Sequence, residues 1–301
     1  MSENTVAIVV TYNRKKLLHK CVDAILSQTL PVDKLLLIDN ASTDGTKEFL
    51  MDLGTLANPL IEYVRLSRNT GAAGGFHEGL KRAYDAGYGW FWLMDDDGVP
   101  DADCLKNLLD KIPENVVISP MSLREDDHKY LSIPVGVGGK VLFNRSDLLS
   151  FKDENGNIFG WSCFYHGTLI SRKVLEKSGL PKPELFLWGD EEEYQMRMKN
   201  SGFSLCTQVT ALFFHPAERR TFQYLFGRYG VVLFDRSWRF FCYFRNHAYI
   251  GRMHKKTHGI KFFMLYSYYT IIKRKSINDF LFFVSAFFDG WLKRFKKRVP
   301  F

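Results

Sequence analysis

The sequence predicts an α/β protein with a doubly wound, mostly parallel sheet, followed by a helical region. The chain has 301 residues, 46% of them hydrophobic and 25% charged, which indicates a globular protein with a substantial core. Over the first 120 residues, strand-like apolar runs alternate with stretches of helical periodicity, a pattern typical of a parallel sheet covered by helices. Beyond residue 217 only helical patterns occur.

The elements follow from these patterns in chain order. Apolar, β-branched runs predict strands at residues 5–11, 34–39, 61–66, 90–94 and 116–119. Apolar residues at helical spacing predict helices at residues 15–28, 46–53, 71–86 and 101–112. Parallel sheets of this kind bind ligands at the carboxyl ends of their strands, so the residues that follow each strand are the candidates for function.

The middle of the chain, residues 120–215, is less regular. Glycines at positions 136, 138 and 139 predict a hairpin or loop. A helix is predicted at residues 191–200, ending at Gly202, and a strand at 205–214 that leads to His215. We therefore divide the chain into a ligand-binding domain, residues 1–216, and a helical region, residues 217–301.

The strongest pattern in the last region is an amphipathic helix at residues 276–298. Its predicted apolar stripe consists of Ile277, Phe280, Leu281, Val284, Phe287, Phe288, Trp291 and Phe295. Its predicted basic end consists of Lys293, Arg294, Lys296 and Lys297. The longest apolar stretches of the region, 262–272 and 280–288, are shorter than the roughly 18–20 residues of a membrane-spanning helix.

Charge separates the two regions. Residues 1–216 hold 23 Lys and Arg and 29 Asp and Glu, a net charge of −6, whereas residues 217–301 hold 18 and 4, a net charge of +14. A basic, aromatic helical region suits the surface of an anionic membrane. Packing on the rest of the chain, or on a second copy as a homo-oligomer, is an alternative, and the acidic first region argues against nucleic acid as the partner.

Cysteine usage and the N-terminal segment bear on the compartment. The five cysteines are odd in number and form no C-x-x-C pair, which indicates neither a disulfide framework nor a zinc ribbon. The first residues lack the cationic start of a signal peptide. We expect a cytoplasmic protein that lies on the inner face of the cell membrane.

Three adjacent carboxylates follow the strand at 90–94. Asp95, Asp96 and Asp97 repel one another unless a cation neutralises them. Oxygen ligands of this kind suit Mg²⁺ or Mn²⁺, which usually bind substrate phosphates as well. The alternative is a solvated acidic turn that caps the next helix.

Two other strand ends carry candidate ligand-binding residues. Asp39 ends the second strand and could accept a hydrogen bond from a nucleobase, although an Asx-turn is the alternative. Arg68 and Asn69 precede a Gly-rich turn that opens a helix, where backbone can approach an anion, or where a tight turn is all that is needed. The turn matches neither G-x-G-x-x-G nor a Walker A motif, which argues against a dehydrogenase or a kinase.

A second acidic group stands at the start of the predicted helix 191–200. Asp190 and Glu191 follow Trp188-Gly189 and precede two further glutamates. One of them could be a general base beside a second substrate, although acids at a helix N-terminus are also favoured by the helix dipole alone. His215 could be a metal ligand or a structural histidine beside Pro216.

Taken together, these motifs resemble glycosyltransferase family 2. The motifs that carry the resemblance are Val9-Val10-Thr11-Tyr12-Asn13-Arg14, Asp39 with Ser42-Thr43-Asp44-Gly45, Arg68-Asn69, Asp95-Asp96-Asp97 and Trp188 to Tyr194. They cover residues 5–216 in the family's order. The Gly-rich turn, the triple Asp and Tyr243-Phe244-Arg245-Asn246 are most similar to bacterial galactofuranosyltransferases, and rhamnosyltransferases share much of the pattern.

The resemblance implies the GT-A fold, a Rossmann-like architecture, and a role for each matching residue. The donor nucleotide and sugar would be held by Thr11, Tyr12, Asn13, Asp39, Arg68, Asn69, Gly74, Asp95, Asp96 and Trp188. Mn²⁺ or Mg²⁺ would be held by Asp97, with His215 and Asp95. The base would be Glu191 or Asp190, because the family usually has Asp where this chain has Glu191.

The implied reaction is an inverting, metal-dependent sugar transfer from a nucleotide-sugar donor. The best match for the donor is UDP-galactofuranose, with dTDP-rhamnose as the alternative, and the implied acceptor is a polyprenyl-diphosphate-linked glycan of cell-surface polysaccharide synthesis. A non-catalytic nucleotide-sugar-binding scaffold is the alternative of a different class. All of these expectations require the carboxylates at 95–97 and at 190–191 to meet at one site.

Overall fold

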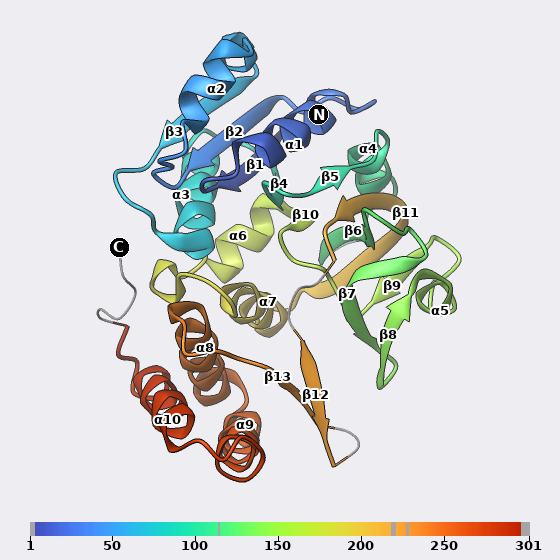
Figure 1. Ribbon diagram of the computed structural model, residues 1–301. Coiled ribbons are helices and arrows are strands. Elements are labelled where there is room, and N and C mark those ends of the chain that lie inside the picture. The colour runs from blue at the N-terminus through green and yellow to red at the C-terminus, as the bar shows by residue number, and fades with distance from the viewer. Residues whose placement is uncertain (1–3, 114, 218–220, 227–228, 296–301) are drawn as a thin grey trace. The chain divides into compact units, whose positions relative to one another are not determined.

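The computed structural model describes residues 4–113, 115–217, 221–226 and 229–295 (Figure 1). The chain divides into two compact units. The first comprises Met1–Pro181 and Arg197–Glu218, and the second comprises Lys182–Met196 and Arg219–Phe301. The division near residue 218 lies close to the boundary chosen from the sequence, while Lys182–Met196 belongs to the second unit.

The first unit is built on a large sheet with the strand order β3-β2-β1-β4-β10-β6-β11-β5. Its parallel part consists of β1 (Thr5–Thr11), β2 (Lys34–Asp39), β3 (Ile61–Arg65) and β4 (Trp90–Asp95). Every residue of β1 is buried, as expected for a central parallel strand. The predicted α/β fold class is therefore confirmed.

Helices cover both faces of the parallel strands. On one face, α1 (Lys15–Leu26) buries Leu18, Cys21, Val22 and Ile25 in the same core cluster as Ala7 and Val9. On the other face, α3 (Gly71–Asp85) lies against β1, where a Cβ at Gly75 would come within 2.4 Å of Val10 and one at Gly79 within 2.5 Å of Ile8. Glycine therefore allows the close approach that brings the start of α3 to the sheet edge.

Beyond β4 the sheet is mixed. The remaining strands are β5 (Val99–Pro100), β6 (Val116–Arg124), β7 (Tyr130–Val137), β8 (Lys140–Asn144), β9 (Asn157–Phe159), β10 (His166–Ser171) and β11 (Ser204–His215). β10 is antiparallel to β4 and β6, whereas β11 is parallel to β6. Gly138 and Gly139 both have positive φ and join β7 to β8, which confirms the predicted hairpin.

Shorter helices connect these strands. They are α2 (Thr46–Asp52), η1 (Thr55–Ala57), α4 (Cys104–Leu109), α5 (Arg145–Leu149) and α6 (Arg172–Ser178). Helix α4 is shorter than the predicted 101–112, and β6 runs five residues past the predicted end at Ser119 because eight of its nine residues are buried. The extension carries β6 as far as Arg124, opposite His215 of β11.

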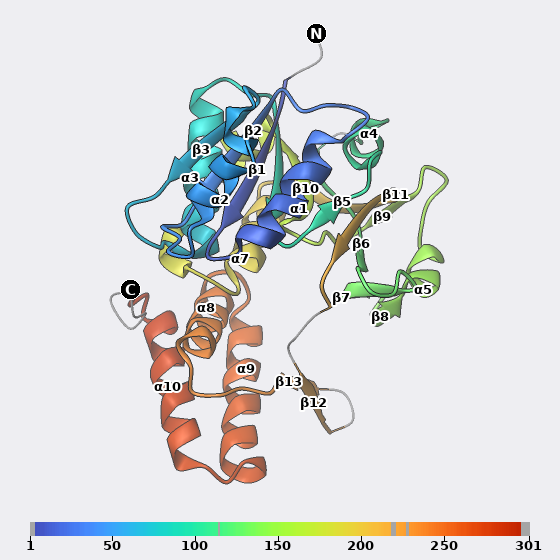
Figure 2. The same ribbon diagram turned by 45° about the horizontal axis from the view of Figure 1, so that its top comes forward.

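The second unit is an aromatic helical bundle. It contains η2 (Pro183–Leu185), the first turns of α7 (Asp190–Asn200), α8 (Trp238–His254), α9 (Lys256–Tyr268), the π-helical turn η3 (Tyr269–Lys273) and α10 (Ile277–Trp291). A Cβ at Gly290 of α10 would come within 1.8 Å of the Arg245 carbonyl oxygen of α8, so glycine sets the distance between these two helices. Figure 2 shows α8, α9 and α10 side by side.

Two predictions for this unit were wrong. Residues past 217 are not only helical, because β12 (Phe222–Leu225) and β13 (Tyr229–Val232) form an antiparallel hairpin. The last helix ends at Trp291, so Lys293 and Arg294 follow the helix, and Lys296, Lys297 and Arg298 lie outside the described residues.

The buried face of α10 also differs from the predicted stripe. Phe283, which is not on that stripe, is buried together with Ala286 and Phe287, while Ile277 and Leu281 are exposed. Among the described residues, none of the helices has both the length and the hydropathy needed to span a membrane.

Candidate active site

The acidic triplet stands where β4 meets the carboxyl-terminal edge of the sheet. The parallel register places Asp95 beside Val10, and Thr11 beside Asp39, so three strand ends share one edge. The triplet turns sharply into β5, and a Cβ at Gly98 would come within 2.1 Å of the Phe213 ring. Glycine at this position therefore lets the triplet lie against β11.

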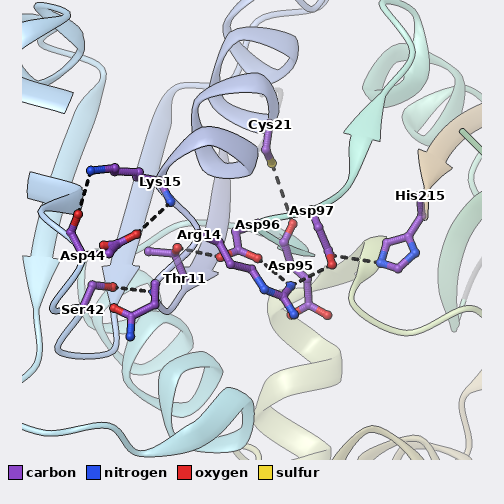
Figure 3. A network of polar contacts seen from close by, with 11 residues as sticks. Thr11, Arg14, Lys15, Cys21, Ser42, Asp44, Asp95, Asp96, Asp97 and His215 are labelled. Carbon is purple, nitrogen blue, oxygen red and sulfur yellow. Dashed lines mark hydrogen bonds and ion pairs between the residues drawn. The ribbon is translucent and has the colours of Figure 1, made fainter. Parts of the chain in front are cut away.

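Arg14 and Thr11 bind the triplet from the β1 side. The Arg14 guanidinium donates to Asp96 Oδ1 at 3.1 Å and to Asp97 Oδ2 at 2.7 Å, and Thr11 Oγ1 donates to Asp96 Oδ2 at 2.6 Å (Figure 3). The motif Thr11-Tyr12-Asn13-Arg14 thus contributes two side chains that hold the carboxylates.

His215 meets Asp97 from the other side. β11 pairs with β5 through Phe213 and Phe214, which brings the end of β11 to the triplet. His215 Nε2 lies 3.0 Å from Asp97 Oδ1, and Figure 3 shows the two side chains pointing toward each other. The structure therefore joins two of the three predicted metal ligands, which lie 118 residues apart in the sequence.

Burial and these contacts raise the pKa of some groups of the site and lower that of another. Burial, together with the charges of Asp97 and Asp96, raises the pKa of Asp95 to about 8. Burial also raises the pKa of Asp96 to about 6, although Arg14 opposes the rise. For Asp97 burial is outweighed by the hydrogen bond and charge of His215, which lower its pKa, and in turn Asp97 raises the pKa of His215 against burial.

The donor set fits a hard divalent cation. Neighbouring ligands of an octahedral Mg²⁺ or Mn²⁺ ion at about 2.1 Å are separated by about 3 Å, the separation between Asp97 Oδ1 and His215 Nε2. Two protein ligands are enough for such ions when substrate phosphates and water supply the rest. Among the described residues, no group of three His, Cys, Asp or Glu side chains converges on one point, so Asp95 as a third ligand stays a prediction.

A second histidine, His166, packs against His215. The buried His166 ring stacks on the His215 ring, with centroids 3.9 Å apart, and its Nδ1 lies 2.9 Å from Ser122 Oγ. Burial, followed by the charge of His215, lowers the pKa of His166 well below its usual value, which favours a neutral ring. His166 was not among the residues predicted from the sequence, because it lies in the irregular middle region and belongs to no motif.

The other predicted donor-binding residues of the first unit organise loops at the same edge. Asn13 Oδ1 accepts from Thr43 N at 2.7 Å, and Tyr12 beside it is 37% exposed. Asp39 is buried: its Oδ1 accepts from Ser42 N at 2.8 Å, and its Oδ2 accepts from the Tyr63 hydroxyl. Asp39 thus makes the loop contacts that the structural alternative predicts.

The Gly-rich turn is also held by side chains of its own. Asn69 Oδ1 accepts from Gly71 N at 2.8 Å, Gly74 is buried against Thr70, and Arg68 is exposed. Asn40, a buried residue outside the set predicted from the sequence, donates to Gly71 O at 2.9 Å and connects the end of β2 to the start of α3. A role of these residues in donor binding stays a prediction.

The second acidic group lies in the second unit, at the start of α7. Glu192 pairs with His247 at 3.3 Å, and Glu193 pairs with Lys182 at 3.7 Å and with His254 at 3.6 Å. Contacts within the second unit therefore account for the last two acids of the run. Asp190 is only 2% exposed, whereas the half-buried Glu191 accepts from Gly189 N at 3.0 Å.

The loop before α7 is strained and clamped. Phe186 and Trp188 both have positive φ, which is costly for residues other than glycine. Asn246 Nδ2 lies 2.8, 3.0 and 2.8 Å from the carbonyl oxygens of Leu185, Leu187 and Trp188. The buried Arg245 adds a bond to Leu185 O at 2.8 Å.

The clamp gives a physical role to Tyr243-Phe244-Arg245-Asn246, which the sequence matched only as a motif. Gly189 lies directly on this clamp, because a Cβ there would come within 3.1 Å of Asn246 Cβ. The two buried polar side chains of α8 thus fix the backbone from which Asp190 and Glu191 extend. The triplet and these two acids belong to different units, and their convergence stays a prediction.

Comparisons with known proteins place this chain in a family. Residues 6–179 match the model of glycosyl transferase family 2. The chain is 31% identical over 256 residues to galactofuranosyltransferase GlfT1 of Mycolicibacterium smegmatis, covering 83% of each chain. It is 32% identical over 255 residues to galactofuranosyltransferase GlfT1 of Mycobacterium tuberculosis, again covering 83% of each chain.

Solved structures share the fold at low identity. GalNAc-T7, crystallised with UDP, GalNAc and Mn²⁺, aligns with a TM-score of 0.64 at 15% identity, covering 97% of this chain and 57% of that one. The mannosyltransferase PcManGT from Pyrobaculum calidifontis, in complex with GDP-Man and Mn²⁺, aligns with a TM-score of 0.53 at 15% identity, covering 95% and 74%. These likenesses support the GT-A fold, and the family match shows that the chain belongs to glycosyltransferase family 2 and is a glycosyltransferase.

Proposed function

We propose that this glycosyltransferase moves galactofuranose from UDP-galactofuranose onto a polyprenyl-diphosphate-linked glycan, with inversion and with Mn²⁺ or Mg²⁺. The observation that carries the site assignment is the Asp97–His215 contact at the edge where the strand ends of β1, β2 and β4 lie together. The two galactofuranosyltransferases that match 83% of the chain support the choice of sugar.

Asp97 and His215 are the residues that would hold the divalent cation. When bound, the cation neutralises the charge that grows on the departing diphosphate. From the opposite side, Thr11 donates to Asp96, while the Arg14 guanidinium neutralises Asp96 and Asp97 as long as no cation is bound. His166 fixes the plane of the His215 ring by stacking on it and by its own bond to Ser122.

We assign the donor nucleotide to the sheet edge between β1 and β2. Tyr12 offers an exposed aromatic ring, and Arg68 an exposed cation, beside loops that Asn13 and Asp39 hold in place. Asp95 and Asp96, at the end of β4, would face the ribose and the sugar. Asn69, Gly74 and Trp188 complete the proposed donor set.

Glu191 is the better candidate for the base that removes the acceptor hydroxyl proton. Its side chain is half-buried and so within reach of an acceptor, whereas Asp190 is almost completely buried. Deprotonated by Glu191, the acceptor oxygen attacks the anomeric carbon as the bond to the nucleoside diphosphate breaks on the opposite face. This attack inverts the anomeric configuration.

The proposed acceptor places the enzyme at a membrane. A polyprenyl chain resides in the bilayer, so the enzyme would work as a peripheral protein on the cytoplasmic face. The net charge of +14 on residues 217–301 supports attraction to an anionic surface.

The test is a donor screen that measures nucleotide release and product formation. Purified protein is incubated with UDP-galactofuranose, dTDP-rhamnose or UDP-glucose, with Mn²⁺, with Mg²⁺ or with a chelator. We expect cation-dependent turnover of UDP-galactofuranose, lost in Asp97→Asn. Turnover of dTDP-rhamnose alone would make the enzyme a rhamnosyltransferase, and binding without turnover of any donor would indicate a scaffold.

The same assay separates the two candidate bases. Glu191→Gln is nearly isosteric, so we expect it to abolish transfer while the affinity for UDP stays unchanged. Asp190→Asn serves as the matched control at the neighbouring position. Normal turnover by Glu191→Gln together with loss in Asp190→Asn would move the assignment to Asp190.

A further inference from the structure

Helices α9 and α10 present apolar side chains to solvent as well as to the core of the second unit. Exposed side chains include Met264 and Ile277, each 65% exposed, and Leu281 at 57%. We name this surface the apolar strip, and it consists of Ile260, Met264, Ile277, Leu281, Phe288 and Leu292. Its members are mostly aliphatic, and five of the six have no role in the aromatic core cluster of this unit.

Helical spacing makes the strip continuous. Ile260 and Met264 are four residues apart on α9, while positions 277, 281, 288 and 292 recur on one side of α10. Phe263 connects the two sets, because its ring on α9 lies 6.0 Å from the ring of Phe288 on α10. The exposed sides of both helices therefore border the same seam.

Cations frame the strip at both of its ends. Exposed Lys273 and Lys275 stand between α9 and α10, and exposed Lys255, Lys256, Lys293 and Arg294 stand at the opposite ends of the two helices. Asp279, an acid near the strip, is buried and paired with Arg274 at 2.7 Å. The surface thus offers apolar area between cationic flanks, with the charge of a nearby acid neutralised.

We propose that the apolar strip and its flanking cations are a membrane-docking surface that binds the headgroup region of an anionic bilayer. The proposal deepens the membrane placement in the proposed function and rests on it. Aliphatic side chains would enter the boundary between headgroups and acyl chains, and lysines would contact lipid phosphates.

Charge favours an anionic bilayer over a second copy of the chain. A symmetric dimer uses the same patch on both subunits, so it would place the cationic flanks of one copy against those of the other. An anionic bilayer supplies the opposite charge instead. Each lysine near such a surface strengthens binding roughly fivefold.

The experiment is flotation of the full chain with vesicles of phosphatidylcholine alone or of equal parts phosphatidylcholine and phosphatidylglycerol. Met264→Gln/Leu281→Gln removes two exposed strip residues, and Lys273→Glu/Lys275→Glu reverses two flanking charges. Val141→Gln/Phe143→Gln is the matched control, because these residues of β8 in the first unit are 59% and 50% exposed. Thermal unfolding and solution mass are measured for each variant.

We expect the wild type and the control to float with the anionic vesicles. The strip variant should lose at least tenfold in vesicle affinity, and the lysine variant should lose most of the preference for anionic lipid. Wild-type affinity in a folded strip variant would overturn the proposal. A wild-type dimer that the strip variant converts to a monomer, without vesicle binding, would identify a second copy as the occupant.

A lipid-free acceptor analogue separates this proposal from the proposed function. Transfer to the soluble analogue should be unchanged in the strip variant, because its residues lie outside the candidate active site. Absence of transfer in every protein, together with the expected flotation, would refute the proposed reaction and leave the docking surface in place.

Discussion

Asn246→Ala tests whether the clamp of α8 holds the proposed base in position. The Asn246 amide is completely buried and lies within 3.0 Å of three carbonyl oxygens of the loop before α7. Each hydrogen bond contributes about 1 kcal/mol net, and an unpaired buried carbonyl costs about 1–3 kcal/mol. With two amide hydrogens lost, we expect the clamp to weaken by about 2–4 kcal/mol.

The loss should fall on the loop because the loop is strained. Positive φ at Phe186 and Trp188 costs about 1–3 kcal/mol each and persists only while surrounding contacts enforce it. Once the amide is gone, the loop can relax and carry Asp190 and Glu191 out of place. If the strained loop conformation loses about 2 kcal/mol of stability relative to the relaxed one, kcat would fall by up to about thirtyfold.

Steady-state kinetics at saturating donor, well below the unfolding midpoint, measures the effect. Phe283→Leu is the control, because it weakens the same unit by roughly 1–3 kcal/mol through its core without touching the loop. We expect a lower kcat in Asn246→Ala only, with unchanged Mn²⁺ affinity in both variants. Equal kcat in Asn246→Ala and wild type would refute the positioning role, as would an equal loss in Phe283→Leu.

Two further predictions concern the acidic triplet. Because the pKa of Asp95 is raised to about 8, the folded chain keeps a proton on this carboxyl that the unfolded chain has lost above about pH 4. In the absence of divalent cations, the free energy of unfolding should therefore fall as pH rises from about 4 to about 8. The fall should be at most about 1.4 kcal/mol per pH unit. Denaturant unfolding of Asp95→Asn against wild type checks this, and an equal slope in both would contradict it. Arg14→Met should raise the affinity for Mn²⁺ roughly tenfold above pH 8, because the Arg14 guanidinium competes with the cation for Asp96 and Asp97. Titration calorimetry measures this affinity, and an unchanged value would show that Arg14 does not compete with the cation.

Sequence patterns predicted the parts of the first unit that periodicity controls. β1 and β4 are apolar runs that end at polar residues, so both their position and the location of the triplet at the sheet edge could be predicted. The contact of His215 with Asp97 depends on the pairing of β5 with β11, and no local sequence pattern predicts that pairing. His215 was a candidate because it follows a predicted strand, and the family resemblance gave it the role of a metal ligand.

Short or mixed patterns were missed for a physical reason. β12 and β13 have four residues each, too few to show an alternation that differs from helical spacing. Asn246 lies about 60 residues from the carbonyl oxygens it binds. Because every residue has a backbone carbonyl, the sequence does not indicate which of them accept a hydrogen bond. A buried polar clamp of this kind can therefore be identified only from the structure.

Helix α10 shows why an aromatic stripe is a poor guide to a docking surface. Phenylalanine is frequent around the whole helix, and the fully buried Phe283 is surrounded by the rings of Phe244, Phe262, Phe263 and Tyr266. The core therefore takes up aromatic side chains, while mainly aliphatic ones such as Leu281 remain exposed. Phe283→Gln should unfold the bundle, whereas Leu281→Gln should leave the unfolding midpoint nearly unchanged and weaken only vesicle binding. A similar loss of stability in both variants would mean that Leu281 belongs to the core, and the outward face of α10 would then have no surface role.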